Sequence, residues 1–253
     1  MALLQLRYFS PALTCQEEVV VLLPERNGQF SGDTTSPYQT LYLLHGLGDD
    51  AMGWLRRTEV DSLVRDTDVA VVMPSVGHSF YTNMARGQRY WDFVSEELPR
   101  YLASMLPLST RREDTFVCGN SMGGYGAFKL ALSHPERFCR AAALSGALDV
   151  ASFVRNQSFP GFDPRAAFGD ELDVAGTPND LLQLVDDAAR SATSLPDLLA
   201  ICGRSDILVD ESRAFVRHVR ERGIGIDYRE REGEHLWTSW QKWLPEVFAW
   251  LTR

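Results

Sequence analysis

Cysteine is scarce in this sequence, and the four that occur lie far apart, at Cys15, Cys118, Cys139 and Cys202. No two of them are spaced as a CxxC pair, so neither a zinc site nor a thioredoxin-like redox motif is indicated. Their neighbours are mostly apolar, as in the segment Phe116–Cys118. We therefore expect buried free thiols rather than a disulfide framework.

Long hydrophobic runs are also lacking, and acidic residues outnumber basic residues. No run reaches the ~18 apolar residues of a membrane-spanning helix, and the start of the chain does not resemble a signal peptide. We therefore expect a cytoplasmic protein. With 34 acidic and 25 basic residues the formal net charge is −9, which disfavours nucleic acid and anionic membranes as main partners. A small neutral substrate and a homo-oligomer remain open.

The 253 residues, 45% of them hydrophobic, are enough for one large domain with a substantial core. Short apolar runs alternate along the chain with helix-length segments. The runs, which predict strands, are Leu3–Phe9, Glu17–Leu23, Leu41–Leu44, Val69–Met73, Thr115–Cys118, Ala141–Leu144, Leu198–Cys202 and Ile224–Tyr228. The predicted helices are Gln88–Met105, Met122–Ser133, Glu211–Glu221 and Trp237–Leu251.

This alternation predicts an α/β fold with a mostly parallel central sheet and helices on both faces, because continuous apolar runs are typical of strands covered on both sides. Residues 149–196 interrupt the rhythm with many Pro, Asp, Gly and Asn residues. We interpret them as an insertion with short helices over the strand ends. Residues 1–253 are then a single domain, and its site is expected beyond the carboxyl ends of the strands.

The segment Gly119–Gly123 fits the pattern G-x-S-x-G, with Ser121 at its centre. A predicted strand precedes it and a predicted helix follows it, which is the context that this motif requires. Small residues two positions before and after the serine allow a tight strand-to-helix turn. Such a turn presents the serine hydroxyl at a helix N-terminus, so Ser121 is the candidate nucleophile.

A serine nucleophile needs a base, and His235 is the best candidate among the five histidines. It lies in a predicted loop between the last strand and the last helix, where an imidazole can project back to Ser121. The sequence narrows the choice of the carboxylate that would orient this histidine less closely. Asp206 follows one predicted strand and is favoured over Asp149, which follows another; Asp210 fits an N-cap better.

An oxyanion hole requires two convergent backbone N–H groups. One belongs to Met122, directly after the candidate nucleophile. The other is expected from the glycine-containing loop after Leu41–Leu44, and we assign it to Leu47. Trp54 and Tyr81 are candidates either for a substrate pocket or for the core. No metal-ligand spacing and no nucleotide-binding glycine pattern is present, so no cofactor is expected.

Taken together, these motifs resemble the esterase D family of α/β-hydrolases, and most closely its bacterial short-chain tributyrin esterases and acetylesterases. The segments that carry the resemblance are Leu43–Gly46, Phe80–Asn83, Trp91-Asp92, Glu96–Pro99, Gly119–Gly124 and His235–Trp237 with Trp240. They extend over nearly the whole chain. The resemblance implies an α/β-hydrolase fold with Ser121, Asp206 and His235 as catalytic triad.

The resemblance also implies a serine carboxylesterase that acts on small acyl groups, including acetyl and butyryl esters and acetylated sugars, through an acyl-enzyme. Two relatives provide alternatives, the S-formylglutathione hydrolases and the feruloyl esterases. The former usually carry a cysteine shortly after the first oxyanion loop, whereas residues Gly48–Met52 contain none. An alternative of another class is a non-catalytic binding protein that has kept the hydrolase fold.

Overall fold

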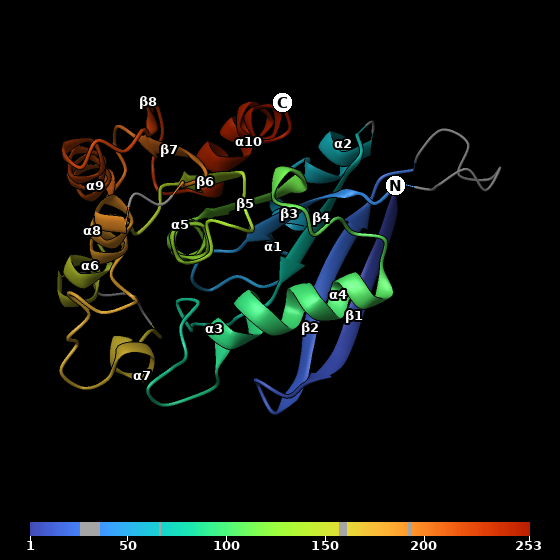
Figure 1. Cartoon of the computed structure of the whole chain (residues 1–253), viewed down its shortest axis with the longest axis horizontal. Coiled ribbons are helices and arrows are strands. Elements are labelled where there is room, and N and C mark those ends of the chain that lie inside the picture. The colour runs from blue at the N-terminus through green and yellow to red at the C-terminus, as the bar shows by residue number, and fades with distance from the viewer. Residues whose placement is uncertain (26–35, 66, 157–160, 192–193) are drawn as a thin grey trace.

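The structure is a computed structural model that describes residues 1–25, 36–65, 67–156, 161–191 and 194–253 (Figure 1). Its described residues form one 8-stranded sheet with the order β1-β2-β4-β3-β5-β6-β7-β8. The strands are β1 (Ala2–Ser10), β2 (Cys15–Leu23), β3 (Gln39–Leu44), β4 (Val69–Pro74), β5 (Thr115–Asn120), β6 (Arg140–Leu144), β7 (Asp197–Gly203) and β8 (Asp227–Arg231).

The sheet is mostly parallel, as the sequence predicts. Strand β2 runs antiparallel to both of its neighbours, β1 and β4, while all pairs from β4 to β8 are parallel. Every residue of β4 and β5 is buried, which explains why these strands are continuous apolar runs in the sequence. The carboxyl ends of β3, β5, β6 and β7 therefore meet at one edge of the sheet.

Helices cover both faces of the sheet (Figure 1). They are α1 (Gly53–Arg57), α2 (Val60–Arg65), α3 (Tyr90–Asp92), α4 (Leu98–Met105), α5 (Met122–Ser133), α6 (Val150–Asn156), α7 (Pro164–Phe168), α8 (Leu181–Ser191), α9 (Val209–Glu221) and α10 (Trp237–Leu251). One apolar core lies between the sheet and α4, α5, α8 and α9. A second core lies on the other face beneath α1, α2 and α10.

The predicted helices at Met122–Ser133 and Trp237–Leu251 have the bounds of α5 and α10. The predicted helix Gln88–Met105 is instead α3, a π-helical turn at Phe93–Glu97, and α4 in succession. The last predicted strand was wrong by three residues: Ile224–Ile226 precede β8, which begins at Asp227. Because β8 is an edge strand, its charged side chains can pair with α9 and α10, so apolarity did not mark its position.

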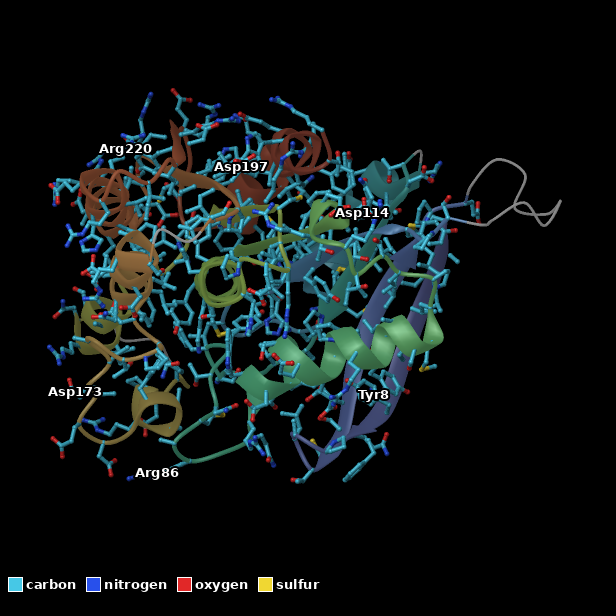
Figure 2. The ribbon with its side chains drawn as sticks, viewed as in Figure 1. Tyr8, Arg86, Asp114, Asp173, Asp197 and Arg220 are labelled. Carbon is cyan, nitrogen blue, oxygen red and sulfur yellow. The ribbon has the colours of Figure 1, made fainter. Side chains whose placement is uncertain are left out.

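Residues 149–196 join β6 to β7 and contribute α6, α7 and α8. Helix α8 packs against α5 and α9, so this segment is part of the same molecular body. The loop after β4 runs beside α7: the N–H of Arg86, which Figure 2 labels at this edge of the molecule, donates to the carbonyl of Ala166 at 2.9 Å. That the insertion lies over the candidate site stays a prediction.

The four cysteines are free, as expected, but they are not all buried. Cys118 and Cys202 are buried, and burial raises the pKa of each thiol to about 12. Cys15, the first residue of β2, is exposed, and Cys139 is half-buried. Among the described residues, no helix is both long and apolar enough to span a membrane.

Candidate active site

Ser121 lies at a sharp turn between β5, which ends at Asn120, and α5, which begins at Met122. Its backbone has φ 52° and ψ −118°, a conformation that L-residues rarely adopt. The turn leaves no room for side chains two residues away. A Cβ on Gly119 would lie 2.3 Å from the Gly123 carbonyl oxygen, and one on Gly123 would lie 2.2 Å from the Leu44 carbonyl oxygen. The glycines of the motif thus make the strained turn sterically feasible.

The structure brings Ser121, His235 and Asp206 together in one chain of contacts. His235 Nε2 lies 2.9 Å from Ser121 Oγ, and His235 Nδ1 lies 3.0 Å from Asp206 Oδ1. Asp206 is in the loop after β7, and His235 is in the loop between β8 and α10. These loops are tied by the Ser205 N–H, which donates to the Gly233 carbonyl at 3.1 Å. Residues 29 and 114 positions apart therefore meet at the carboxyl edge of the sheet.

The surroundings of Asp206 favour its ionised form although the residue is only 4% exposed. Burial by itself raises the pKa of the carboxyl, but contacts with His235, the Leu208 N–H and the Ser145 hydroxyl outweigh it and hold the pKa below its ordinary value. A charged carboxylate at this position can accept the Nδ1–H of His235. That contact leaves Nε2 as an acceptor facing the Ser121 hydroxyl, which is the arrangement that a general base requires.

The two competing carboxylates have other partners. Asp149 Oδ1 accepts the Ser152 N–H at 3.0 Å at the start of α6. Asp210 lies in the first turn of α9, not at its N-cap, and pairs with Arg213 at 2.9 Å. None of these bonds brings Asp149 or Asp210 to the imidazole of His235. Of the three candidate acids, Asp206 is the one in contact with His235.

Two backbone N–H groups lie beside Ser121 without a partner. Met122 is the first residue of α5, so its N–H has no intrahelical acceptor. Leu47 follows Gly46, on which a Cβ would lie 3.4 Å from Ser121 Cβ, so this loop runs close to the serine. In the part of the chain that the structure describes, neither N–H forms a hydrogen bond. Both are available to an oxyanion, and the positive end of the α5 dipole adds to the effect.

The Leu47 loop is held by buried side chains. The Val76 N–H donates to His45 Nε2 at 3.1 Å, which leaves the proton on Nδ1, 2.8 Å from the Gly46 carbonyl oxygen. Burial lowers the pKa of His45, which favours this neutral form. Tyr81 Oη donates to the His45 carbonyl at 2.9 Å. His45 therefore shapes its own loop and makes no contact with the triad through these bonds.

Comparison with known proteins agrees with this geometry. Residues 10–251 match the family model described as "Putative esterase". The chain belongs to this esterase family. It is 33% identical to an acetyl esterase of Caldicellulosiruptor saccharolyticus over 100% of the chain and 99% of that protein. Two solved structures from Staphylococcus aureus are similar over 100% of the chain. They are FphF, a fluorophosphonate-binding serine hydrolase (TM-score 0.95, 32% identity, 98% of its chain), and the S-formylglutathione hydrolase FrmB (TM-score 0.91, 32% identity, 99% of its chain).

These similarities place the esterase among the serine hydrolases of the esterase D family, with the α/β-hydrolase fold. The protein is thus an enzyme that hydrolyses esters through a serine. Among its described residues, no group of three or more His, Cys, Asp or Glu side chains is placed to hold a metal ion. That the reaction needs no cofactor stays a prediction.

Trp54 and Tyr81, the two candidates for a substrate pocket, lie in the core of the esterase and are 0% exposed. Trp54 Nε1 donates to the Leu44 carbonyl at 3.0 Å, just as Tyr81 Oη donates to that of His45. Both side chains thus satisfy backbone acceptors at the end of β3. In this structure they support the loop that carries the Leu47 N–H and offer no surface to a substrate.

Ser145 is a site residue that the sequence reasoning missed. It is 0% exposed at the carboxyl end of β6, its Oγ accepts from Trp240 Nε1 at 3.0 Å, and its hydroxyl contacts Asp206. Trp240 also packs its ring edge-to-face on His235, with centroids 5.1 Å apart. Ser145 and Trp240 therefore fix two members of the triad. A serine directly after a predicted strand was the available signal, but it resembles an ordinary turn residue.

Proposed function

We propose that this esterase hydrolyses short-chain acyl esters, acetyl and butyryl esters in particular, with Ser121 as nucleophile, His235 as general base and Asp206 as the carboxylate that orients it. The observation that carries the proposal is the continuous contact from Ser121 Oγ through the His235 imidazole to Asp206. A buried carboxylate that is kept ionised has a clear use here, since it stabilises the imidazolium formed during the reaction.

In the acylation half-reaction, Ser121 Oγ attacks the ester carbonyl carbon while His235 Nε2 takes the hydroxyl proton. The carbonyl oxygen becomes an oxyanion that accepts hydrogen bonds from the N–H groups of Leu47 and Met122. His235 then gives its proton to the alkoxy oxygen as the bond between carbon and that oxygen breaks. The alcohol leaves, and the acyl group remains on Ser121.

Deacylation reverses these roles. A water molecule gives a proton to His235 Nε2 and attacks the acyl carbonyl, and the same two N–H groups hold the second oxyanion. When this intermediate collapses, His235 returns the proton to Ser121 Oγ. The carboxylic acid leaves and the free enzyme is restored, so that one ester and one water give one acid and one alcohol.

The choice of a short acyl group is supported by the acetyl esterase that matches the chain from end to end. The S-formylglutathione hydrolase FrmB, which also matches over the whole chain, supports a second candidate, a thioester with a one-carbon acyl group. Both candidates use the same contacts. They differ in the leaving group, an alcohol in one case and a thiol in the other.

The variant Ser121→Ala tests the nucleophile. We expect kcat for p-nitrophenyl acetate to fall by about 10⁵-fold or more, because a triad without its nucleophile retains only binding and oxyanion stabilisation. Labelling by a fluorophosphonate probe should disappear as well. Ser104→Ala, on the exposed side of α4, is the matched control and should keep full activity. Retention of most activity by a folded Ser121→Ala protein would overturn the assignment.

A substrate panel tests the acyl and leaving groups. We expect kcat/KM to be highest for p-nitrophenyl acetate or butyrate and lower for both methyl ferulate and S-formylglutathione. A preference for S-formylglutathione would favour the second candidate, and a preference for methyl ferulate would favour a feruloyl esterase. If no substrate turns over and no fluorophosphonate label attaches to Ser121, the chain is a binding protein with a hydrolase fold.

A further inference from the structure

A cavity of about 410 Å³ lies at the far end of the sheet from Ser121. It is bounded by the Phe93–Glu97 turn and α4 on one side and by the end of α5 on the other. Its wall includes Thr115, the first residue of β5, whereas Ser121 follows the last residue of that strand. About 17 Å of extended chain separates the two ends. Asp114, labelled in Figure 2, lies at the same end of β5 as the cavity.

The interior of this cavity is apolar and partly aromatic. Tyr42 and Phe138 form part of its wall, with ring centroids 6.3 Å apart and planes at 82°. Val94, Pro99, Ala103 and Leu130 complete the apolar part. The volume falls within the range of small-molecule sites, which are usually apolar with a few placed polar groups. A ligand here would need an apolar body.

Some of the polar groups on the cavity wall already have hydrogen-bond or ion-pair partners within the protein. The Ser109 hydroxyl donates to Asp114 at 2.6 Å, and the Thr115 hydroxyl donates to the Arg111 carbonyl at 2.8 Å. The guanidinium of Arg137 is engaged by Glu96 at 2.8 Å and by the Ser95 carbonyl. These groups have partners within the protein and would gain little from a ligand.

Besides the exposed Thr110 hydroxyl, two donors on the wall have no partner among the described residues. Tyr42 lines the cavity and is only 8% exposed, and its hydroxyl makes no hydrogen bond to the described residues. Burial raises the pKa of Tyr42 far above its ordinary value, so the hydroxyl stays protonated and can donate. Arg100, on α4 at the rim, forms no ion pair with the described part of the chain. Both groups are therefore open to a ligand that enters the cavity.

We propose that this cavity is a second binding site, separate from the triad, for a small monocarboxylate with an apolar body. The Tyr42 and Thr110 hydroxyls and Arg100 can all donate, and Arg100 is a cation, so the complementary ligand is an anionic acceptor. Arg100 meets the carboxylate at the rim, the Tyr42 hydroxyl donates to an acceptor oxygen deeper in the cavity, and the apolar body packs against Phe138 and Leu130. The site does not depend on the catalytic assignment of Ser121.

The test uses the full chain with Ser121 blocked by a fluorophosphonate, so that binding at the triad is excluded. Titration with 3-phenylpropanoate, followed by calorimetry, should show saturable binding at one site. Arg100→Gln and Tyr42→Phe should each raise Kd by about fivefold or more, because each removes a donor that the carboxylate ligand uses. Arg57→Gln, an exposed arginine on α1, is the matched control and should leave Kd unchanged.

Two further measurements keep the outcome decisive. The neutral analogue 3-phenylpropanol should bind the native protein more weakly than 3-phenylpropanoate does. On Arg100→Gln the two ligands should bind with equal Kd. Ala103→Phe, which fills the cavity from the exposed side of α4, should abolish binding without lowering the thermal midpoint. The proposal fails if the blocked enzyme shows no saturable binding, or if Kd is the same in the native protein, Arg100→Gln, Tyr42→Phe and Ala103→Phe.

Discussion

At the scale of single residues, Lys129 shows how the interior of the esterase constrains charge. It is 2% exposed in the middle of α5. Its Nζ donates to the Tyr81 carbonyl at 3.0 Å and to Asn179 Oδ1 at 2.7 Å, and lies 4.2 Å from the centre of the Trp91 ring. Burial lowers the pKa of Lys129 to about 7 despite these contacts. The residue links the insertion, through Asn179, to the tyrosine that supports the Leu47 loop.

This pKa predicts an unusual dependence of stability on pH. Between pH 7 and 10.5 the unfolded chain binds more protons at Lys129 than the folded protein does, so the residue makes stability rise with pH in that window. From pH 7 to 9 its contribution is about 2 kcal/mol. Urea unfolding should show that Lys129→Met loses this rise, whereas the matched control Lys242→Met, on the exposed side of α10, keeps it. An unchanged slope in Lys129→Met would contradict the lowered pKa.

The choice of acid gives a second prediction for single residues. Asp206→Asn should lower kcat by about 10⁴-fold, because an amide neither fixes the imidazole tautomer nor stabilises the imidazolium. Asp149→Asn should change kcat by less than about tenfold, since the Asp149 carboxylate caps the start of α6 by accepting the Ser152 N–H. Steady-state kinetics on p-nitrophenyl acetate decide between them. The assignment is wrong if Asp149→Asn, and not Asp206→Asn, abolishes turnover.

At the scale of elements, the site depends on the close approach of β3, β5 and α5. The Gly123 position on α5 faces the last carbonyl of β3, and a Cβ there would also lie 2.8 Å from the His45 carbonyl oxygen. Both are backbone atoms that cannot rotate away. The same glycine that allows the turn at Ser121 thus brings α5 against the segment that carries the Leu47 N–H.

We therefore expect Gly123→Ala to be costly in two ways. The free energy of unfolding should fall by about 3 kcal/mol from overpacking, and kcat should fall because the Leu47 loop must move. Gly225→Ala is the matched control: a Cβ at Gly225 would meet nothing within 4 Å, so stability should stay within about 1 kcal/mol of the native value. Chemical denaturation and kinetics measure both. Native kcat in a stable Gly123→Ala protein would contradict this account.

The elements also mark where sequence patterns predict structure well and where they do not. Helix α5 and the central strands were predicted closely because their apolar runs are bounded by glycine or proline. The short helices α1 and α2 were not predicted, since Trp54, Val60 and Val64 are too few to establish a helical period. At β8, alternating charges such as Arg229 and Glu230 concealed an edge strand, because ion pairs with neighbouring helices replace apolar burial there.

At the scale of the whole molecule, one sheet carries a core on each of its faces. Phe128 on α5 belongs to the first core and Trp243 on α10 belongs to the second, and both are almost fully buried. Because both cores pack against the same strands, loss of packing in one core exposes the strands that also support the other core. This is the physical basis for expecting residues 1–253 to unfold as a single domain.

Core substitutions on the two faces test that expectation. Phe128→Ala and Trp243→Ala should each lower the free energy of unfolding by about 3–5 kcal/mol, from lost burial and the cavity left behind. In each variant, near-ultraviolet dichroism, far-ultraviolet dichroism and loss of activity should share one transition. Two separated transitions would show that the faces unfold independently and would contradict the single-domain prediction.

The sequence by itself determined the fold class and the residue types at the site, because G-x-S-x-G and the strand-ending glycines act through local sterics. Only the tertiary structure decided which acid contacts His235, that Ser145 and Trp240 hold the pair in place, and that Trp54 and Tyr81 lie in the core. These outcomes depend on close approaches between segments far apart in the sequence, such as Gly203 at the end of β7 and Gly233 in the loop after β8. A Cβ on Gly203 would lie 2.3 Å from the Gly233 carbonyl oxygen. Local patterns carry no information about such approaches, since the sheet order that creates them is set by packing across the whole chain.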